Sequence, residues 1–187
     1  MIVPSIYQLD GEDYLLTTQI KPEFSYAVNK QVSLWLSYTY SSNDYRQSDY
    51  DDRDSHSHEV FLDTVYTFGD DRGYVLGGVG YEDNSASKDI YDYGRLMVRA
   101  GGSFETAYAL RLGVMGSYAG KTYKKDDLIE DKQREDARYK FSVSLSRELY
   151  YEWLEIAAEF TYTKNDSNIT DYEYTRQNVG IGLSATF

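Results

Sequence analysis

The sequence predicts an all-β protein, an antiparallel up-and-down transmembrane β-barrel of about eight to ten strands. Apolar and polar residues alternate with a period of two along most of its 187 residues. Pro4 and Pro22 are its two prolines, so little interrupts extended structure beyond the N-terminal region. The chain also holds 21 tyrosines, a residue that favours strands and membrane interfaces.

The alternation is clearest in residues 31–41, where Trp35 is the one large apolar residue on the polar row. The apolar row there consists of Val32, Leu34, Leu36, Tyr38 and Tyr40. Residues 2–9 could supply a short additional strand. The same pattern predicts eight other strands, at 20–28, 59–68, 74–82, 95–104, 108–121, 138–148, 154–163 and 176–187.

The predicted connections alternate in length. The short ones cover 29–30, 69–73, 105–107 and 149–152, and the long polar ones cover 42–57, 83–91, 124–137 and 164–172. Outer-membrane barrels have tight periplasmic turns and long extracellular loops, so we expect the long connections outside the cell. Hairpins that recur roughly every 40 residues also suit a propeller, but a blade needs four short strands where this chain has two long ones.

Charge and composition exclude several classes of protein. The chain has 31 acidic and 19 basic residues, a net charge of −12, which disfavours a nucleic-acid partner. No segment approaches the roughly 18 apolar residues of a membrane helix, and there is no cysteine for a disulfide or thiolate site. The start, Met1 to Pro4, lacks the features of a signal peptide. We therefore expect numbering from a mature start, or a fragment.

Charged residues on the polar rows are the main candidate site. An isolated ion buried in a barrel interior is costly, and a barrel of this size is filled largely by side chains. We therefore expect a salt-bridged interior in which Glu155 and Glu159 pair with arginines. The alternative is a pore with one basic and one acidic wall. The residues expected to face the lumen are Arg95, Arg99, Arg111, Lys121, Lys140, Glu155, Glu159 and Asp63.

Two short clusters are weak candidates for metal binding or catalysis. His56 and His58 are two residues apart, so they share one side of a strand, but no nucleophile partners them. Carboxylates that could bind calcium are Asp49, Asp51, Asp52 and Asp54, although they lack the spacing and glycine of an EF-hand. A solvated polar loop explains both clusters, and we predict no enzyme activity, no catalytic residue and no cofactor.

The C-terminal strand resembles known outer-membrane proteins. Gly182, Leu183 and the terminal Phe187 resemble the signal that barrel assembly machinery reads, although Ala185 stands where a larger residue is commoner. The segment 165–187 resembles the end of two groups, the surface lipoprotein assembly modifier family and putative porins associated with exopolysaccharide export. The segment 21–26, Lys-Pro-Glu-Phe-Ser-Tyr, with the strand that follows it to Tyr40, is similar to the same groups.

This resemblance implies a location in the bacterial outer membrane, with its lipid and the barrel assembly machinery as partners. It implies a transport or export barrel, or part of one, whose cargo the sequence does not name. The alternative is a small non-channel barrel that acts through its extracellular loops in adhesion or envelope stability. Members of these families have larger barrels, so residues 1–187 form either a whole barrel or the C-terminal part of one.

Overall fold

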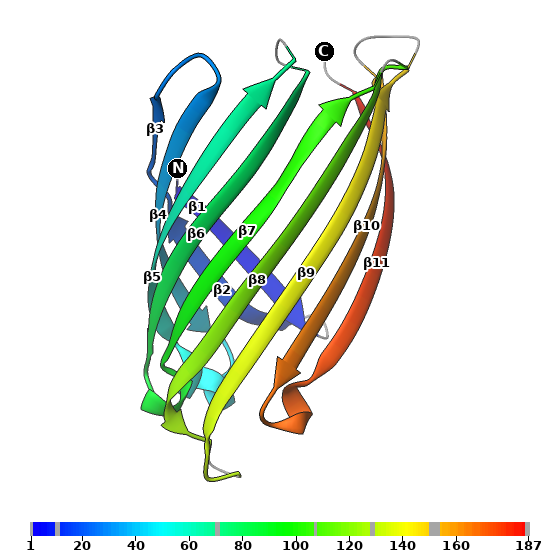
Figure 1. Ribbon diagram of the computed structural model, residues 1–187. Coiled ribbons are helices and arrows are strands. Elements are labelled where there is room, and N and C mark those ends of the chain that lie inside the picture. The colour runs from blue at the N-terminus through cyan, green and yellow to red at the C-terminus, as the bar shows by residue number, and fades with distance from the viewer. Residues whose placement is uncertain are drawn as a thin grey trace.

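The computed structural model describes residues 2–9, 12–69, 72–106, 108–127, 130–149 and 154–185. Its strands form one antiparallel sheet, in which neighbours along the chain are neighbours in space apart from β3 (Figure 1). The strands are β1 (Ile2–Leu9), β2 (Glu12–Ile20), β3 (Glu23–Ala27), β4 (Val32–Tyr45), β5 (Ser55–Phe68), β6 (Gly73–Ala86), β7 (Tyr93–Glu105), β8 (Leu110–Asp126), β9 (Gln133–Glu148), β10 (Leu154–Ser167) and β11 (Tyr174–Ala185).

The all-β, up-and-down prediction is confirmed, but the described part has eleven strands rather than eight to ten. The additional strand is β2, whose adjacent apolar residues Leu15 and Leu16 break the period of two. It ends at Ile20, and Lys21 and Pro22 separate it from β3. The strands β2 and β3 pair with successive parts of β4. The sheet is not closed among the described residues, and β1 and β11 form its edges.

The connections do alternate in length, but the contrast is smaller than the sequence suggested. The strands continue through much of the polar sequence, which leaves connections at 46–54, 87–92, 127–132 and 168–173. Three of them contain short 3-10 helices, namely η1 (Ser48–Arg53), η2 (Asp89–Tyr91) and η3 (Thr170–Tyr172). Asp, Asn and Ser lower the average hydropathy of a strand end without preventing its backbone pairing, so hydropathy alone does not separate these strand ends from loops.

At the opposite end the connections are tight. Gly69 has a φ of +65°, a left-handed conformation that suits glycine, and its carbonyl accepts a hydrogen bond from the Arg72 amide at 3.2 Å. In the view of Figure 1 these tight turns lie at the top and the 3-10 helices at the bottom. Within the described residues, no helix has the length and apolar character needed to cross a bilayer.

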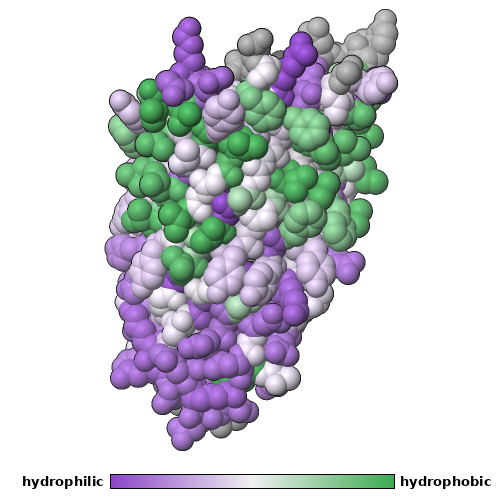
Figure 2. Space-filling model, in the orientation of Figure 1, coloured by the Kyte–Doolittle hydropathy of each residue, from purple (hydrophilic) through white to green (hydrophobic). Residues whose placement is uncertain are grey.

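The two faces of the sheet differ in chemistry. The convex face carries rows of apolar residues that oppose one another on successive strands. One such row runs from β4 to β9 through Leu36, Leu62, Val79, Val98, Tyr118 and Tyr139. These side chains are 37–48% exposed in the protein alone. Figure 2 shows hydrophobic residues gathered toward the tight-turn end and hydrophilic residues covering the other. Such a belt matches the lipid-facing band of a membrane barrel.

The concave face is polar. Buried residues that the register places on it are Ser41, Ser55, Ser57, Asp63, Glu82, Asn84, Asp136, Thr161, Thr163 and Asn165, whereas buried hydrophobic residues in the described part are only Phe61, Tyr123 and Ile169. The sheet therefore turns its apolar side outward. This arrangement is the reverse of a soluble β-sandwich, in which the inner faces are apolar.

Candidate functional site

The strand register places all eight charged residues singled out from the sequence on the concave face. One row of directly opposed residues runs from Asp63 through Gly78, Arg99, Ser117, Lys140 and Thr163 to Arg176. A second row runs through Glu59, Glu82, Arg95, Lys121 and Asp136. We call the residues of these two rows the charged wall.

The strongest contact of the charged wall joins Arg99 and Asp63, which lie on β7 and β5. The Arg99 Nε donates to Asp63 Oδ1 at 2.8 Å, and a guanidinium nitrogen contacts Oδ2. The pairing is bidentate, the geometry in which arginine binds a carboxylate most strongly. The Arg99 guanidinium also lies 4.3 Å from the Phe61 ring centroid. Two charges are therefore held in one defined geometry on the concave face.

A glycine makes this contact across the intervening strand β6 possible. Gly78 on β6 lies directly between Asp63 and Arg99 in the register. A Cβ atom added there would overlap the Asp63 carboxylate, and one added at Gly80 would overlap the Phe61 ring. The glycine-rich sequence of β6 does not by itself show which of its residues face inward. The structure shows that these glycines leave room for side chains from both neighbouring strands.

Arg95 makes the second interstrand pair. Its guanidinium contacts the Glu82 carboxylate directly opposite and lies 3.5 Å from a Glu59 carboxylate oxygen. The Tyr93 hydroxyl donates a hydrogen bond to the Glu82 carboxylate, with 3.1 Å between the two oxygens. Like charges side by side on a sheet destabilise it, and Arg95 relieves the proximity of Glu59 and Glu82. The partners of the arginines are thus acids of β5 and β6.

The acids expected as partners, Glu155 and Glu159, do not pair with an arginine in the described part of the chain. They lie on β10, three strands from β7, and the Glu159 carboxylate instead accepts from the Thr161 hydroxyl at 2.9 Å. Arg111 lies near the tight turns, 4.0 Å from Glu105, with both side chains exposed. Alternation along a strand predicts the face of a residue, but not which strand carries its partner.

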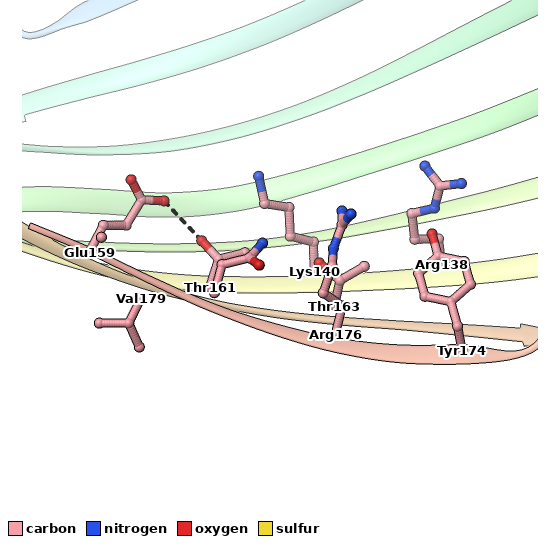
Figure 3. Close-up of a pocket in the computed structure, with 10 residues that line it drawn as sticks. Arg138, Lys140, Glu159, Thr161, Thr163, Tyr174, Arg176 and Val179 are labelled. Carbon is pink, nitrogen blue, oxygen red and sulfur yellow. Dashed lines mark hydrogen bonds between the residues drawn. The ribbon is translucent and has the colours of Figure 1, made fainter. Parts of the chain in front are cut away.

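The concave face of β9, β10 and β11 is basic, and we call this region the basic wall. A cavity of about 500 Å³ there is lined by the cations Arg138, Lys140 and Arg176 and by one carboxylate, Glu159. In Figure 3 the Lys140, Arg176 and Glu159 side chains extend to the same side of the sheet, whereas Val179 points away from it. Among the described residues, no carboxylate forms an ion pair with any of these three cations. This part of the wall can bind or guide anions.

The weak metal candidates have other partners. Asp52 pairs with Lys88 at 2.8 Å, and this hydrogen bond raises the pKa of Lys88. Asp54 accepts a hydrogen bond from the Tyr45 amide, while His56 and His58 contact the hydroxyls of tyrosines on β4. Asp49 and Asp51 lie in the first turn of η1. In the part of the chain that the structure describes, no His, Cys, Asp or Glu residues group around a metal position.

A recurring pair of residues was missed in the sequence. Asn84 and Asn165, each 3% exposed, donate to the main-chain carbonyls of Tyr91 and Tyr172 at 3.2 and 2.8 Å. In both cases seven positions separate the two residues, and the tyrosine lies in a 3-10 helix. Asn43 of β4 and Tyr50 of η1 have the same spacing. A search for spacings shared by the polar connections would have found this repeat.

The expected C-terminal signal is only partly described. Gly182 and Leu183 lie on β11, opposite Ala157 and Ile156 of β10, and Leu183 is 69% exposed on the convex face. Phe187 lies outside the described residues. The proposed recognition by assembly machinery therefore stays a prediction.

Solved structures of OmpT, an outer membrane protein of Vibrio cholerae, are similar in fold. The in-vitro folded form has a TM-score of 0.61 and 11% identity over 98% of this chain and 63% of that chain. The outer-membrane expressed form has a TM-score of 0.60 and 11% identity, over 96% and 62%. This chain thus spans less than two thirds of the length of these proteins.

No curated protein matches the chain. The family model described as surface lipoprotein assembly modifier matches residues 5–187, which is nearly the whole sequence.

Proposed function

Because the chain belongs to the surface lipoprotein assembly modifier family, we propose that it forms the wall of an outer-membrane barrel that helps lipoproteins reach the outer face. The proposal places the convex apolar belt against lipid in the outer membrane of a Gram-negative bacterium. The polar concave face then lines the path along which cargo moves.

The observation that carries this proposal is the chemistry of the concave face. A barrel that serves only as a rigid anchor needs an interior filled by mutually paired side chains. The pairs of Arg95 and Arg99 satisfy that requirement on β5 to β7. On β9 to β11, however, Arg138, Lys140 and Arg176 line a cavity and are not paired with carboxylates in the described part. Solvated charges on a cavity wall favour a hydrated path over a filled interior.

The test is the surface display of lipoproteins in the host of this protein. The gene is deleted, lipoproteins are labelled with a palmitate analogue, and intact cells are treated with protease. We expect loss of protease-accessible labelled proteins and recovery with the full-length wild-type gene. A variant with Arg138, Lys140 and Arg176 changed to Gln should recover less display. The matched control is Lys164→Gln, because Lys164 lies on the convex face, where it pairs with Asp166 at 2.8 Å.

Equal display of lipoproteins in the deletion strain would remove the export role. It would favour the runner-up function, a non-channel barrel that acts through its extracellular loops.

A further inference from the structure

At the polar end of the sheet, a second cavity lies apart from the basic wall of β9 to β11. It has a volume of about 270 Å³, and residues from β4 through β9 line it together with residues of all three 3-10 helices. Its lining includes three cations, Arg53, Lys121 and Arg134, five tyrosines and two asparagines, but no carboxylate. In a chain with a net charge of −12, such a local excess of positive charge is notable.

Two of these cations have no acidic partner. In the described part of the chain, no carboxylate oxygen lies within 4.0 Å of the Arg53 or Lys121 nitrogens. Lys121 Nζ instead donates to the Tyr123 hydroxyl at 2.7 Å and lies 3.6 Å from the Tyr93 ring centroid. Arg53 lies 5.0 and 5.2 Å from the ring centroids of Tyr50 and Tyr91. Both side chains are half-buried, so their positive charge is only partly solvated.

Arg134 is held differently and completes the cavity. Asp136 binds it with both carboxylate oxygens, at 3.0 and 2.7 Å, and the guanidinium lies 3.2 Å from the Tyr172 ring centroid. Asp136 therefore neutralises Arg134, whereas neither Arg53 nor Lys121 forms an ion pair in the described part of the chain. Tyrosine rings attract a cation weakly through their faces, but they do not cancel its charge. The tyrosines instead hold the cations in place around the cavity.

We propose that this cavity binds the oxyanion of a ligand, a phosphate or a carboxylate, between Arg53 and Lys121. Phosphate and carboxylate oxygens accept hydrogen bonds from both cation types. Tyrosine hydroxyls and the Asn43 and Asn84 amides in the lining provide further polar groups for the rest of the ligand. The site is separate from the cavity on β9 to β11, because it lies where the strands meet the 3-10 helices and no residue lines both cavities.

The experiment is titration calorimetry on the full-length protein in a non-ionic detergent. Inorganic phosphate and glucuronate are the anionic probes, and glucose is the neutral counterpart of glucuronate. We expect at least one anion to bind, with weaker binding at higher salt, and glucose to give no heat. Binding of phosphate alone identifies a phosphate site, and binding of glucuronate alone identifies a carboxylate site. Absence of binding by both anions, or equal binding of glucose, overturns the proposal.

Variants separate the cavity from nonspecific charge. Lys121→Met should weaken the binding of the anion at least tenfold. Lys124→Met is the matched control, because Lys124 lies on the other face of β8 and pairs with Asp83 at 2.9 Å. Arg53→Gln changes a residue of η1, outside the strand ladder, and tests the cavity even if the Lys121 variant fails to fold. Unchanged affinity in both Lys121→Met and Arg53→Gln would show that the anion binds elsewhere.

Discussion

Arg99 on β7 reaches across β6 and binds the carboxylate of Asp63 on β5, with Nε 2.8 Å from Oδ1. Asp63 is buried, whereas the Arg99 side chain is 44% exposed. The acid therefore depends on this contact more than the base does. Because the strand between them carries Gly78 at the crossing point, the contact also depends on the absence of a side chain there.

Gly78→Ala should consequently break the Arg99–Asp63 pair. The new methyl group would occupy the position of the Asp63 carboxylate, which leaves a buried charge without its partner. We expect a loss of roughly 1–3 kcal/mol in the free energy of unfolding, measured by urea denaturation in detergent. The matched control is Gly77→Ala, since a Cβ at Gly77 meets no atom within 4 Å. Equal stability of the two variants would contradict the crossing geometry.

A double-mutant cycle measures how tightly the same pair is coupled. Arg99→Gln and Asp63→Asn should each destabilise the protein, and the double variant should lose less than the sum of the two. We expect a coupling energy of about 0.5–3 kcal/mol in the free energy of unfolding. A coupling near zero would mean that water solvates both charges. That result would favour a hydrated lumen along β5 to β7 as well.

The sequence predicted which face each residue occupies because strand geometry makes this a matter of parity. Once Leu112 and Val143 are assigned to the apolar side, Arg111 and Ser144 must point the other way. The register confirms the facing of these residues, with Leu112 opposite Leu145 and Val143 opposite Val114. The all-β fold and its up-and-down order followed from the same alternation.

Relations between strands were not accessible in this way. The partners of Arg95 and Arg99 depend on which strands adjoin β7 and on the gap that Gly78 leaves, and alternation along one strand contains neither fact. Similarly, the cavity between Arg53 and Lys121 joins residues that lie far apart in the sequence. The strand β2 was missed because Leu15 and Leu16 interrupt the alternation that identified the other strands.

Adjacent residues of β9 test the orientation of the sheet in the membrane. Val143 lies on the convex face, opposite Val114 and Phe160, whereas Ser144 lies on the concave face, opposite Glu159. Val143→Arg should cost about 2–4 kcal/mol of folding free energy in lipid bilayers, because the charge enters hydrocarbon. Ser144→Arg should cost much less, since Glu159 can pair with the new cation. Reversed effects would show that the concave face meets the lipid.

The polar end with the 3-10 helices should face outward. Trypsin added to intact cells should cleave after Lys88 or Lys132, which lie in the longer connections and are 47% and 44% exposed. The bond after Arg72, in the tight turn that follows Gly69, should be cut only when the cells are broken. Mass spectrometry of the released peptides distinguishes the two ends. Cleavage after Arg72 alone in intact cells would reverse the topology.

Ion selectivity tests the hydrated path itself. If the basic wall of β9 to β11 borders water, its positive side chains should attract mobile anions and repel mobile cations. This effect extends over about one Debye length, which is about 8 Å at physiological salt. Planar-bilayer recordings of the full-length protein under a KCl gradient should then give a reversal potential that favours chloride. Changing Lys140 and Arg176 to Glu should shift it toward potassium, whereas Lys164→Glu on the convex face should leave it unchanged. No conductance in any of these proteins would instead indicate a filled interior, because unpaired wall charges without water would be too costly to bury.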